Sequence, residues 1–528
     1  MKNLPDHGPR FFEGSYPLFR WRHTGKRILW ILAAGLPATP AVLPGQIAQT
    51  AYVKAWNAAE YDAFGTDVAV SGNTLAVLAT GKNPGVFVYV RDTEGLWARQ
   101  AYLQGAGPEE IAVNNVAMDG DIIAMGYPQT LLPGGLEAAG CVDVFTRANG
   151  KWRAEVRLKS LAPAARGFFG DTVSVSGNTL VVGASGSQTT EVFVREAQPE
   201  EGSPPGPPRH IWRRQASLRP ADPDLKPGNA GGGYAAVSGD TIAVGVDGVP
   251  GWVRVGDHDM KRTIGAIYVF TRKGTAWTQE ARIQGSMTAE RHFGYVLALK
   301  KDLLAAGSGE GTSLYDRVAG VWTLRGHLPV QPWDLALSDT SLLIGASGHD
   351  SGSSISDTPP PPDDQGAFGS GSAWLYRTDP RNWQKLVAYL KASNSRKFYQ
   401  FGGDVALDGD TAAIAAAAED RAPQQTSGPV DSPLNRLEWS GAVYVFNTRR
   451  AKYAVEGFAM SGDRFTLDFH STPGITDWTL LGTSDPEKGF STDLSPKTLF
   501  SEDPPGTYRA VVDVTGAGPR YFMRLEHD

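Results

Sequence analysis

Short runs in which hydrophobic and polar residues alternate recur along most of the chain. In residues 152–158, for example, Trp152, Ala154, Val156 and Leu158 fall on one face and charged residues fall on the other. A period of two is the pattern of a half-buried β-strand. Because no long stretch has helical periodicity, the pattern predicts an all-β protein.

A tight turn with Gly beside Ser, Asp or Asn separates successive pairs of predicted strands. The first is Ser71-Gly72-Asn73, between the hydrophobic runs 66–70 and 74–78. Gly supplies the positive φ that short hairpin turns need. Equivalent turns lie at residues 119–121, 176–178, 238–240 and 408–410, and residues 300–302 and 338–340 occupy the same place without Gly. The spacing therefore predicts seven repeats of one unit whose loops vary in length.

Each unit continues with two further strands. The third strands are predicted at residues 86–90, 141–145, 191–194, 266–270, 313–315, 373–376 and 442–446. In six units the fourth strand is predicted to open with a tryptophan: Trp97, Trp152, Trp212, Trp277, Trp322 and Trp383. Six large aromatic residues at one register are expected to be structural anchors between units rather than sugar-binding platforms.

The seventh unit has no fourth strand after it. Residues 442–446 are followed by Asn447-Thr448-Arg449-Arg450, whereas residues 47–53 carry the fourth-strand pattern but precede the first unit. A closed ring in which the N-terminal strand completes the last unit explains both observations. Seven four-stranded units closed in this way form a seven-bladed β-propeller, which leaves only short, protected strand edges.

The units resemble FG-GAP repeats, the integrin-alpha-type propeller blades of bacterial exported proteins. The Phe-Gly dipeptide stands at residues 64–65, 169–170, 293–294 and 401–402, and units two, four and six depart from it. The resemblance covers about residues 47–447 and implies a propeller that binds a ligand. Integrin blades often hold calcium in an acidic loop, but the Asp-Gly-Asp turns at 119–121 and 408–410 are too short to surround a cation. No cofactor is therefore expected.

The two ends of the chain differ from the repeats. Residues 1–41 place a basic segment before an apolar run that contains prolines, which is typical of a secretory signal peptide. An uncleaved membrane anchor is the alternative. We predict a signal peptide at 1–41, the propeller at 42–453, and a small all-β, sandwich-like module at 454–528. The mature N-terminus is expected between residues 41 and 47, in a secreted, cell-surface or periplasmic protein.

The net charge and the single cysteine exclude some kinds of partner and site. The chain has 528 residues, with 50 Lys and Arg against 56 Asp and Glu, a formal net charge of −6. Residues 1–41 contain six of these basic and two of the acidic residues, so the remainder has 44 and 54 and a net charge of −10. A mildly acidic chain argues against a nucleic-acid partner. The single Cys141 excludes an intramolecular disulfide and a Cys-based zinc site. A monomer without a membrane-spanning segment in the mature chain is expected.

Four long inserts between the second and third strands are the candidate recognition loops. They are residues 127–140, 247–264, 349–371 and 419–440, and the blade geometry places all of them on one face. A further insert, 197–211, belongs to the opposite face and has the composition of a solvated linker. The candidate ligand-binding residues in these loops are Trp252, Asp257, His258, Asp259, His349, Asp350 and Trp439. The alternatives are a solvated loop at 257–259, an extended loop after 350, and loop-base packing for Trp439.

No catalytic motif is recognisable. The chain lacks a Gly-x-Ser-x-Gly elbow, a His-Glu-x-x-His pair and a phosphate-binding glycine loop ahead of a helix. The sequence therefore favours an exported, non-catalytic binding or adhesion protein whose ligand is an extracellular glycan or protein. A polysaccharide lyase or glycoside hydrolase that assembles its site from several blades is the first alternative. A structural envelope protein is the second.

Overall fold

In the computed structural model, the described residues form two compact units, one within Gln46–Ala451 and one within Lys452–Asp528. The described ranges are 47–93, 95–105, 113–198, 209–222, 225, 233–246, 249–255, 258–285, 292–350, 367–381, 383–422, 436–448, 453–461, 464–471, 478–483, 492–493, 498–502, 507–513 and 522–527. The predicted signal peptide at 1–41 lies outside them.

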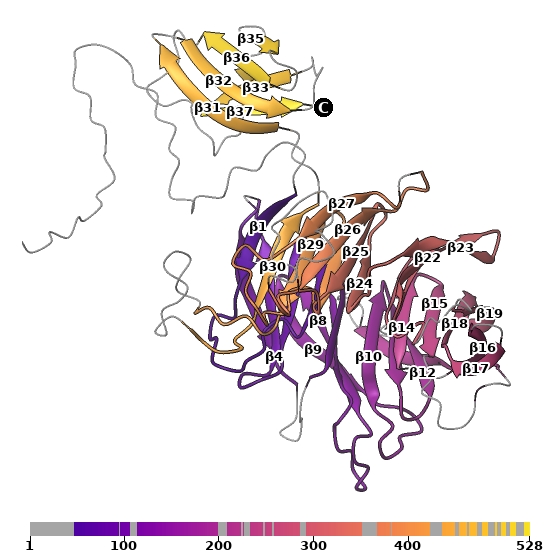
Figure 1. The fold of residues 1–528 in the computed structure, drawn as a ribbon. Coiled ribbons are helices and arrows are strands. Elements are labelled where there is room, and N and C mark those ends of the chain that lie inside the picture. The colour runs from indigo at the N-terminus through magenta and orange to yellow at the C-terminus, as the bar shows by residue number, and fades with distance from the viewer. Residues whose placement is uncertain are drawn as a thin grey trace, which may run out of the picture. The chain divides into compact units, whose positions relative to one another are not determined.

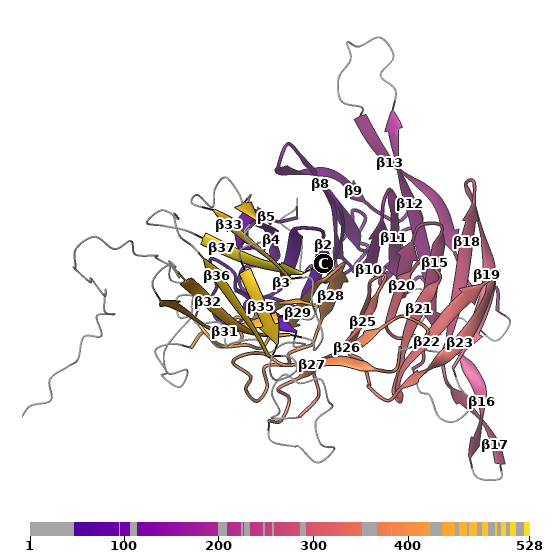
Figure 2. The same cartoon turned by 90° about the horizontal axis from the view of Figure 1, so that it is seen from above.

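The first unit is a seven-bladed β-propeller, as predicted (Figures 1 and 2). Blades 1 to 3 consist of β2 (Asp67–Ser71), β3 (Thr74–Ala79), β4 (Gly85–Arg91) and β5 (Trp97–Leu103); β6 (Asn115–Asp119), β7 (Ile122–Tyr127), β8 (Cys141–Ala148) and β9 (Lys151–Leu158); and β10 (Phe169–Ser176), β11 (Thr179–Ala184), β12 (Thr189–Gln198) and β13 (Arg209–Leu218). Blades 4 to 7 consist of β14 (Tyr234–Ser238), β15 (Thr241–Val246), β18 (Ala266–Lys273) and β19 (Ala276–Gln284); β20 (Leu297–Lys300), β21 (Leu303–Ser308), β22 (Gly311–Val318) and β23 (Val321–Leu328); β24 (Asp334–Leu337), β25 (Ser341–Ala346), β26 (Ser372–Arg377) and β27 (Leu386–Leu390); and β28 (Val405–Asp408), β29 (Thr411–Ala416), β30 (Ala442–Asn447) and β1 (Ala48–Val53).

The N-terminal strand closes the ring. β1 pairs antiparallel with β30, with Val53 opposite Val443 and Ala48 opposite Asn447, and Figure 1 shows the two strands side by side. The Thr50 hydroxyl also donates to the Val445 carbonyl over 3.2 Å. Without β1, β30 would expose an unpaired edge and part of its hydrophobic face. The predicted closure is therefore confirmed.

The propeller core lies between adjacent blades. The second strands, such as β11 and β29, are buried along their whole length, whereas fourth strands such as β9 are only half-buried. The cluster between blades 7 and 1 shows the pattern, because it joins Val443 of β30 to Leu75 of β3 and Phe87 of β4. Burial on both faces explains why the middle strands read as continuous hydrophobic runs and the outer strands alternate.

Five of the six tryptophans lie in fourth strands at or near their first residue, and they anchor one blade to the next. The indole N–H groups of Trp152 and Trp277 donate to glutamine side chains of the preceding blade over 2.7 Å. The prediction for Trp383 is wrong, because β27 begins only at Leu386. Trp383 is instead buried against Gly326 of blade 5, where a Cβ would come within 2.4 Å of the indole ring. The ring fills space that only a glycine leaves free.

Side chains in or next to the first strands connect blades at five junctions around the ring axis: 1 to 2, 2 to 3, 3 to 4, 6 to 7 and 7 to 1. Asp67 of β2 accepts a hydrogen bond from the Val116 N–H of blade 2 over 2.8 Å, and Asn115 of β6 accepts one from Val173 of blade 3 over 3.0 Å. The same bond is made by Ser174 to Val237, by Asp334 to Val405, and by Asp404 to Val68. We call these residues the axial acceptors.

The second unit is a small all-β module with two antiparallel sheets. The order in one sheet is β31 (Tyr453–Ser461), β32 (Arg464–Ser471), β36 (Thr507–Asp513), β35 (Thr498–Glu502), and the order in the other is β34 (Thr492–Asp493), β33 (Trp478–Thr483), β37 (Phe522–His527). The small all-β module predicted at 454–528 is therefore present as two sheets.

Candidate functional site

A recurring contact fixes the base of each long insert to the connection that enters the next blade. The N–H of the Phe in each Phe-Gly dipeptide donates to the carbonyl of the residue before a glycine that leads into the third strand. The pairs are Phe64 to Ser440, Phe169 to Ala139, Phe293 to Ile264 and Phe401 to Ser370, over 2.9–3.2 Å. The long inserts are carried by blades 7, 2, 4 and 6. Each Phe-Gly dipeptide stands in the unit that follows one of these blades, which are units one, three, five and seven. We call this contact the Phe–Gly clasp.

The glycine in each clasp is required by geometry. Gly441 has a φ of +77°, and a Cβ there would lie 2.0 Å from the Phe64 carbonyl oxygen. The corresponding glycines of the other three clasps, Gly140, Gly265 and Gly371, have φ between +75° and +86° and equally close approaches. Only glycine tolerates both the left-handed conformation and the contact.

Exposed aromatic residues lie directly above two of the clasps. In blade 6, Phe368 and Phe398 are 58% and 59% exposed, and their ring centroids are 5.4 Å apart. In blade 7, Tyr61 and Trp439 are 55% and 49% exposed. We call these pairs the blade-6 platform and the blade-7 platform.

The two platforms share a backbone arrangement but not the same aromatic positions, because Tyr61 and Glu438 stand where blade 6 has Phe398 and Phe368, and Trp439 stands where it has Gly369. The Phe398 N–H donates to the Phe368 carbonyl over 2.9 Å, and the Tyr61 N–H donates to the Glu438 carbonyl over 2.7 Å. The Tyr61 hydroxyl also donates to the Glu438 carboxylate over 2.6 Å. In blade 2 the same positions are held by Arg166 and Glu137, whose backbones make the same bond over 2.6 Å. The aromatic character is thus a property of blades 6 and 7 and is not required by the clasp.

Three of the four platform residues have positive φ: Tyr61 at 64°, Phe398 at 68° and Trp439 at 53°. The left-handed region is uncommon for bulky residues, and holding one there costs about 1–3 kcal/mol. Such strain persists only where the surroundings over-determine the conformation. Arg166 and Ala138 have φ of 57° and 48° at the same positions of blade 2, so the conformation is a property of the clasp.

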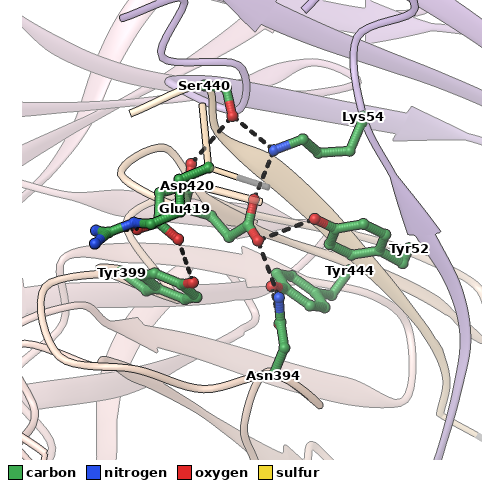
Figure 3. A network of polar contacts seen from close by, with 9 residues as sticks. Tyr52, Lys54, Asn394, Tyr399, Glu419, Asp420, Ser440 and Tyr444 are labelled. Carbon is green, nitrogen blue, oxygen red and sulfur yellow. Dashed lines mark hydrogen bonds and ion pairs between the residues drawn. The ribbon is translucent and has the colours of Figure 1, made fainter. Parts of the chain in front are cut away.

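A buried polar network supports the blade-7 platform (Figure 3). Lys54, directly after β1, donates to the Glu419 carboxylate over 2.6 Å and to the Ser440 hydroxyl over 2.8 Å. The side chains of Lys54 and Glu419 are 5% and 0% exposed. Burial lowers the pKa of Lys54 more than the Glu419 charge raises it. Because Ser440 follows Trp439 in the clasp, the ion pair holds the backbone that carries the platform.

The network continues from Glu419 into the connection between blades 6 and 7. The other Glu419 oxygen accepts from the Tyr52 hydroxyl over 3.0 Å and from the Asn394 amide over 2.9 Å. The Asn394 carbonyl oxygen accepts in turn from the Tyr444 hydroxyl. Burial, together with the Glu419 charge, raises the pKa of both tyrosines. The hydroxyls are therefore fixed as neutral donors.

A second carboxylate links this network to the blade-6 platform. Asp420 accepts from the Tyr399 hydroxyl over 2.5 Å and from the Arg436 guanidinium over 2.7 Å. Tyr399 is buried and follows Phe398 in the chain. Figure 3 shows Asp420 and Glu419 side by side with their partners around them. Glu419 and Asp420 are adjacent in the chain, and they connect the supports of the two platforms through buried side chains.

The arrangement is suited to holding exposed rings rigidly. Lys54 and Glu419 carry opposite charges that would suit acid–base chemistry, but both are enclosed by protein and by their own partners. The accessible groups are aromatic faces, the Tyr61 hydroxyl and the Glu438 carboxylate.

The residues predicted from the sequence are not brought together. Trp439 belongs to the blade-7 platform. His349 is half-buried at the base of the blade-6 insert, where its ring contacts Trp374 and Tyr389. Asp350 accepts from the Gly369 N–H over 2.7 Å and so shapes the same loop.

The insert of blade 4 contains a β-hairpin. β16 (Pro250–Val255) pairs with β17 (His258–Thr263), and Figure 2 shows the hairpin extending away from the blade sheets. The backbone of Trp252, His258 and Asp259 lies in this hairpin, but their side chains are not described. Asp257 lies outside the described residues. The expected linker at 197–211 is also partly strand, since β12 and β13 pair up to Gln198 and Arg209.

The sequence interpretation missed Phe368, Phe398 and Tyr61. A signal was available, because Tyr61 and Phe398 each stand three residues before the Phe of a Phe-Gly dipeptide, and Phe368 stands three residues before Gly371.

Three of the axial acceptors are aspartates of consecutive blades: Asp334 of blade 6, Asp404 of blade 7 and Asp67 of blade 1. Burial, together with the charge of Asp334, raises the pKa of Asp67 to about 7, and burial raises the pKa of Asp334 to about 6. Burial and the charges of Asp67 and Asp334 also raise the pKa of Asp404. In the described ranges, no three His, Cys, Asp or Glu residues are grouped so that they could hold a metal ion.

Comparisons with known proteins give the fold alone. No family profile matches the chain. No curated protein matches it in sequence either. Similar solved structures include the β-propeller domain of Cps50 (Swd1) from Myceliophteria thermophila, at 10% identity and a TM-score of 0.43 over 76% of this chain and 100% of that one. BamB from Moraxella catarrhalis is 9% identical, with a TM-score of 0.35 over 88% of this chain and 99% of that one. A putative 6-phosphogluconolactonase from Bacteroides fragilis is 10% identical, with a TM-score of 0.39 over 63% of this chain and 85% of that one. None of the described residues forms a helix with the length and apolar character needed to cross a membrane.

Proposed function

We propose that this protein is an exported, non-catalytic binding or adhesion protein, and that the blade-6 and blade-7 platforms are its ligand-contact surface. The ligand is an extracellular glycan or protein. The export signal read in residues 1–41 and the resemblance of the blades to FG-GAP repeats support the setting. A β-propeller scaffold fits a binding role, although fold alone never determines function.

The observation that carries the proposal is the uneven distribution of exposed aromatic residues. All six exposed aromatic side chains among the described propeller residues lie at the insert end of their blades: Tyr61, Tyr234, Trp333, Phe368, Phe398 and Trp439. The exposed apolar residues of the opposite end are aliphatic, as in Val318, Val321 and Leu324 of blade 5. Aromatic residues dominate the energetics of binding surfaces.

Binding to arrays of extracellular glycans and surface proteins tests the proposal. F398A and W439A are expected to weaken binding by about thirtyfold, the effect of losing about 2 kcal/mol at an anchor residue. V321A is the matched control, because Val321 is 61% exposed on the opposite face. Both platform variants should melt at the temperature of the parent protein.

Two outcomes would contradict the proposal. One is loss of binding in V321A together with unchanged binding in F398A and W439A. The other is the appearance of new reducing ends or unsaturated uronates when the protein is incubated with a polysaccharide panel, because that result identifies an enzyme.

A further inference from the structure

The support beneath the platforms is duplicated in adjacent blades. In blade 7, Tyr52-Val53-Lys54 ends the fourth strand, and in blade 6 Tyr389-Leu390-Lys391 ends it in the same register. The corresponding residues of the other blades are Tyr102-Leu103-Gln104, Arg157-Leu158-Lys159, Ser217-Leu218-Arg219, Arg282-Ile283-Gln284 and His327-Leu328-Pro329. The Tyr-x-Lys sequence thus occurs only in the two blades that carry aromatic platforms.

The two lysines make matching contacts. Lys391 donates to the Ser370 hydroxyl over 2.6 Å, as Lys54 donates to Ser440 over 2.8 Å. Each of these serines precedes the glycine of a clasp, and each is fully buried. Lys391 is itself only 2% exposed. In both blades a buried ammonium group therefore holds the clasp residue under the exposed rings.

The remaining positions also correspond. His349 replaces Glu419, and the two residues make the same backbone contact, accepting from Gly371 over 2.9 Å and from Gly441 over 2.8 Å. Tyr389 packs on Trp374 at 5.0 Å between centroids, as Tyr52 packs on Tyr444 at 5.3 Å. Burying a lysine is costly, and long charged side chains are almost never fully buried without partners. Two such lysines at one register show that the supports beneath the two platforms have the same geometry.

Resting on the function proposed above, we infer that the platforms are two aromatic subsites, built on one repeated support, for a linear, uncharged polysaccharide. Two aromatic surfaces on the same support, related by the rotation from blade to blade, match a ligand that presents the same group repeatedly. The apolar C–H face of a sugar ring lies flat on an aromatic ring, and its hydroxyls bond to neighbouring polar groups such as the Tyr61–Glu438 pair. A single protein epitope has no such repeat.

The charges around the platforms favour an uncharged chain. Exposed side chains of both signs surround them, with Lys397 and Arg436 against Glu60 and Glu438. Arg436 is also paired with the buried Asp420. The electrostatic potential along the platforms therefore does not have the single sign that would attract a polyanion or a polycation.

The experiment measures binding of neutral oligosaccharides as a function of chain length. Cello-, xylo- and chito-oligosaccharides from dimer to octamer are titrated into the exported protein, with calorimetry and Trp fluorescence as readouts. In the series that binds, affinity is expected to rise by tenfold or more at the length that spans both platforms, because the second contact becomes intramolecular. The F368A/F398A variant and W439A should each lose this rise while still binding short chains. V321A should keep it.

The outcomes separate this inference from the proposed function. Platform-dependent binding of an array protein without binding of any oligosaccharide overturns the polysaccharide inference and leaves the function standing. Loss of all binding in either platform variant, without a length-dependent rise in the parent, indicates one composite site and overturns the two-subsite inference. Absence of both glycan and protein ligands rejects both proposals.

Discussion

Replacing Asp67 with Asn is expected to stabilise the propeller at pH 8 and to have no such effect at pH 4. Asp67 is 6% exposed, and its neighbours at the ring axis include Asp404 and Asp334. The pKa of Asp67 rises from 3.8 to about 7 on folding. The substitution is structurally conservative, because Asn115 already performs the same role in blade 2 by accepting from Val173 over 3.0 Å.

The sign follows from where the proton is held. Well below pH 3.8 the carboxyl is neutral in both the folded and the unfolded chain, so ionisation contributes nothing. Between pH 4 and about pH 7 the unfolded chain ionises while folded Asp67 keeps its proton, so folding stability falls as the pH rises. One pKa unit corresponds to 1.36 kcal/mol, and the full shift therefore amounts to about 4 kcal/mol at pH 8.

The expected gain is smaller than this limit. At pH 8 the Asn variant avoids the ionisation penalty, but it replaces an acceptor shared with other carboxyls by a neutral amide, at a cost of about 1–2 kcal/mol. A net gain of about 1–3 kcal/mol at pH 8 remains. At pH 4 the variant should be neutral or destabilised by about 1 kcal/mol.

Urea unfolding of D67N and the parent protein at pH 4, 6 and 8 measures the effect, with fluorescence of the propeller tryptophans as the signal. D339N is the control, because Asp339 is 57% exposed in a surface pair with Lys301 and should change stability little at any pH. A gain of the same size at every pH, or a loss at pH 8, would refute the assignment of a raised pKa at the ring axis.

Four further predictions concern the scaffold and its ligand. K54M should destabilise the protein by about 3–5 kcal/mol in urea unfolding, because it leaves the buried Glu419 carboxylate without its ion-pair partner. G441A should cost more than about 3 kcal/mol or prevent folding, whereas G72A, with open space around a new Cβ, should cost only about 1 kcal/mol. Intact-mass measurement of the exported protein should place its N-terminus within residues 41–47, and a full-length chain in the membrane fraction would contradict this. Ligand affinity should survive EDTA, because the short turns offer no calcium loop.

The architecture could be predicted because it is repeated in the sequence. Alternation recurs in all seven units and the Gly turn in five of them, and the displaced strand at 47–53 is a further local signal. The closure between β1 and β30 followed from counting strands. Trp383 shows the limit of this reasoning, since its register in the sequence matches the other tryptophans but β27 starts three residues later.

The candidate site was less predictable because its parts are distant in the chain. Tyr61 and Glu438 are 377 residues apart, and Lys54 and Glu419 are 365 apart. Asp257-His258-Asp259 attracted attention as a local cluster of polar groups, whereas Phe368 and Phe398 looked like ordinary hydrophobic residues until the clasp placed them on the surface. Local composition reveals clusters along the chain but not contacts made by ring closure.

The Phe–Gly clasp separates the evolution of the inserts from that of the blades. The clasp glycine also donates to a carbonyl near the start of its insert, as Gly371 does to His349 and Gly441 does to Glu419, and so joins the two ends of the insert. The inserts themselves range from residues 127–140 in blade 2 to 349–371 in blade 6. Doubling the length of a closed loop costs only about 0.6 kcal/mol in chain entropy. Lineages can therefore lengthen, shorten or exchange these segments without repacking the core, and the same four positions would accept foreign loops grafted by an engineer.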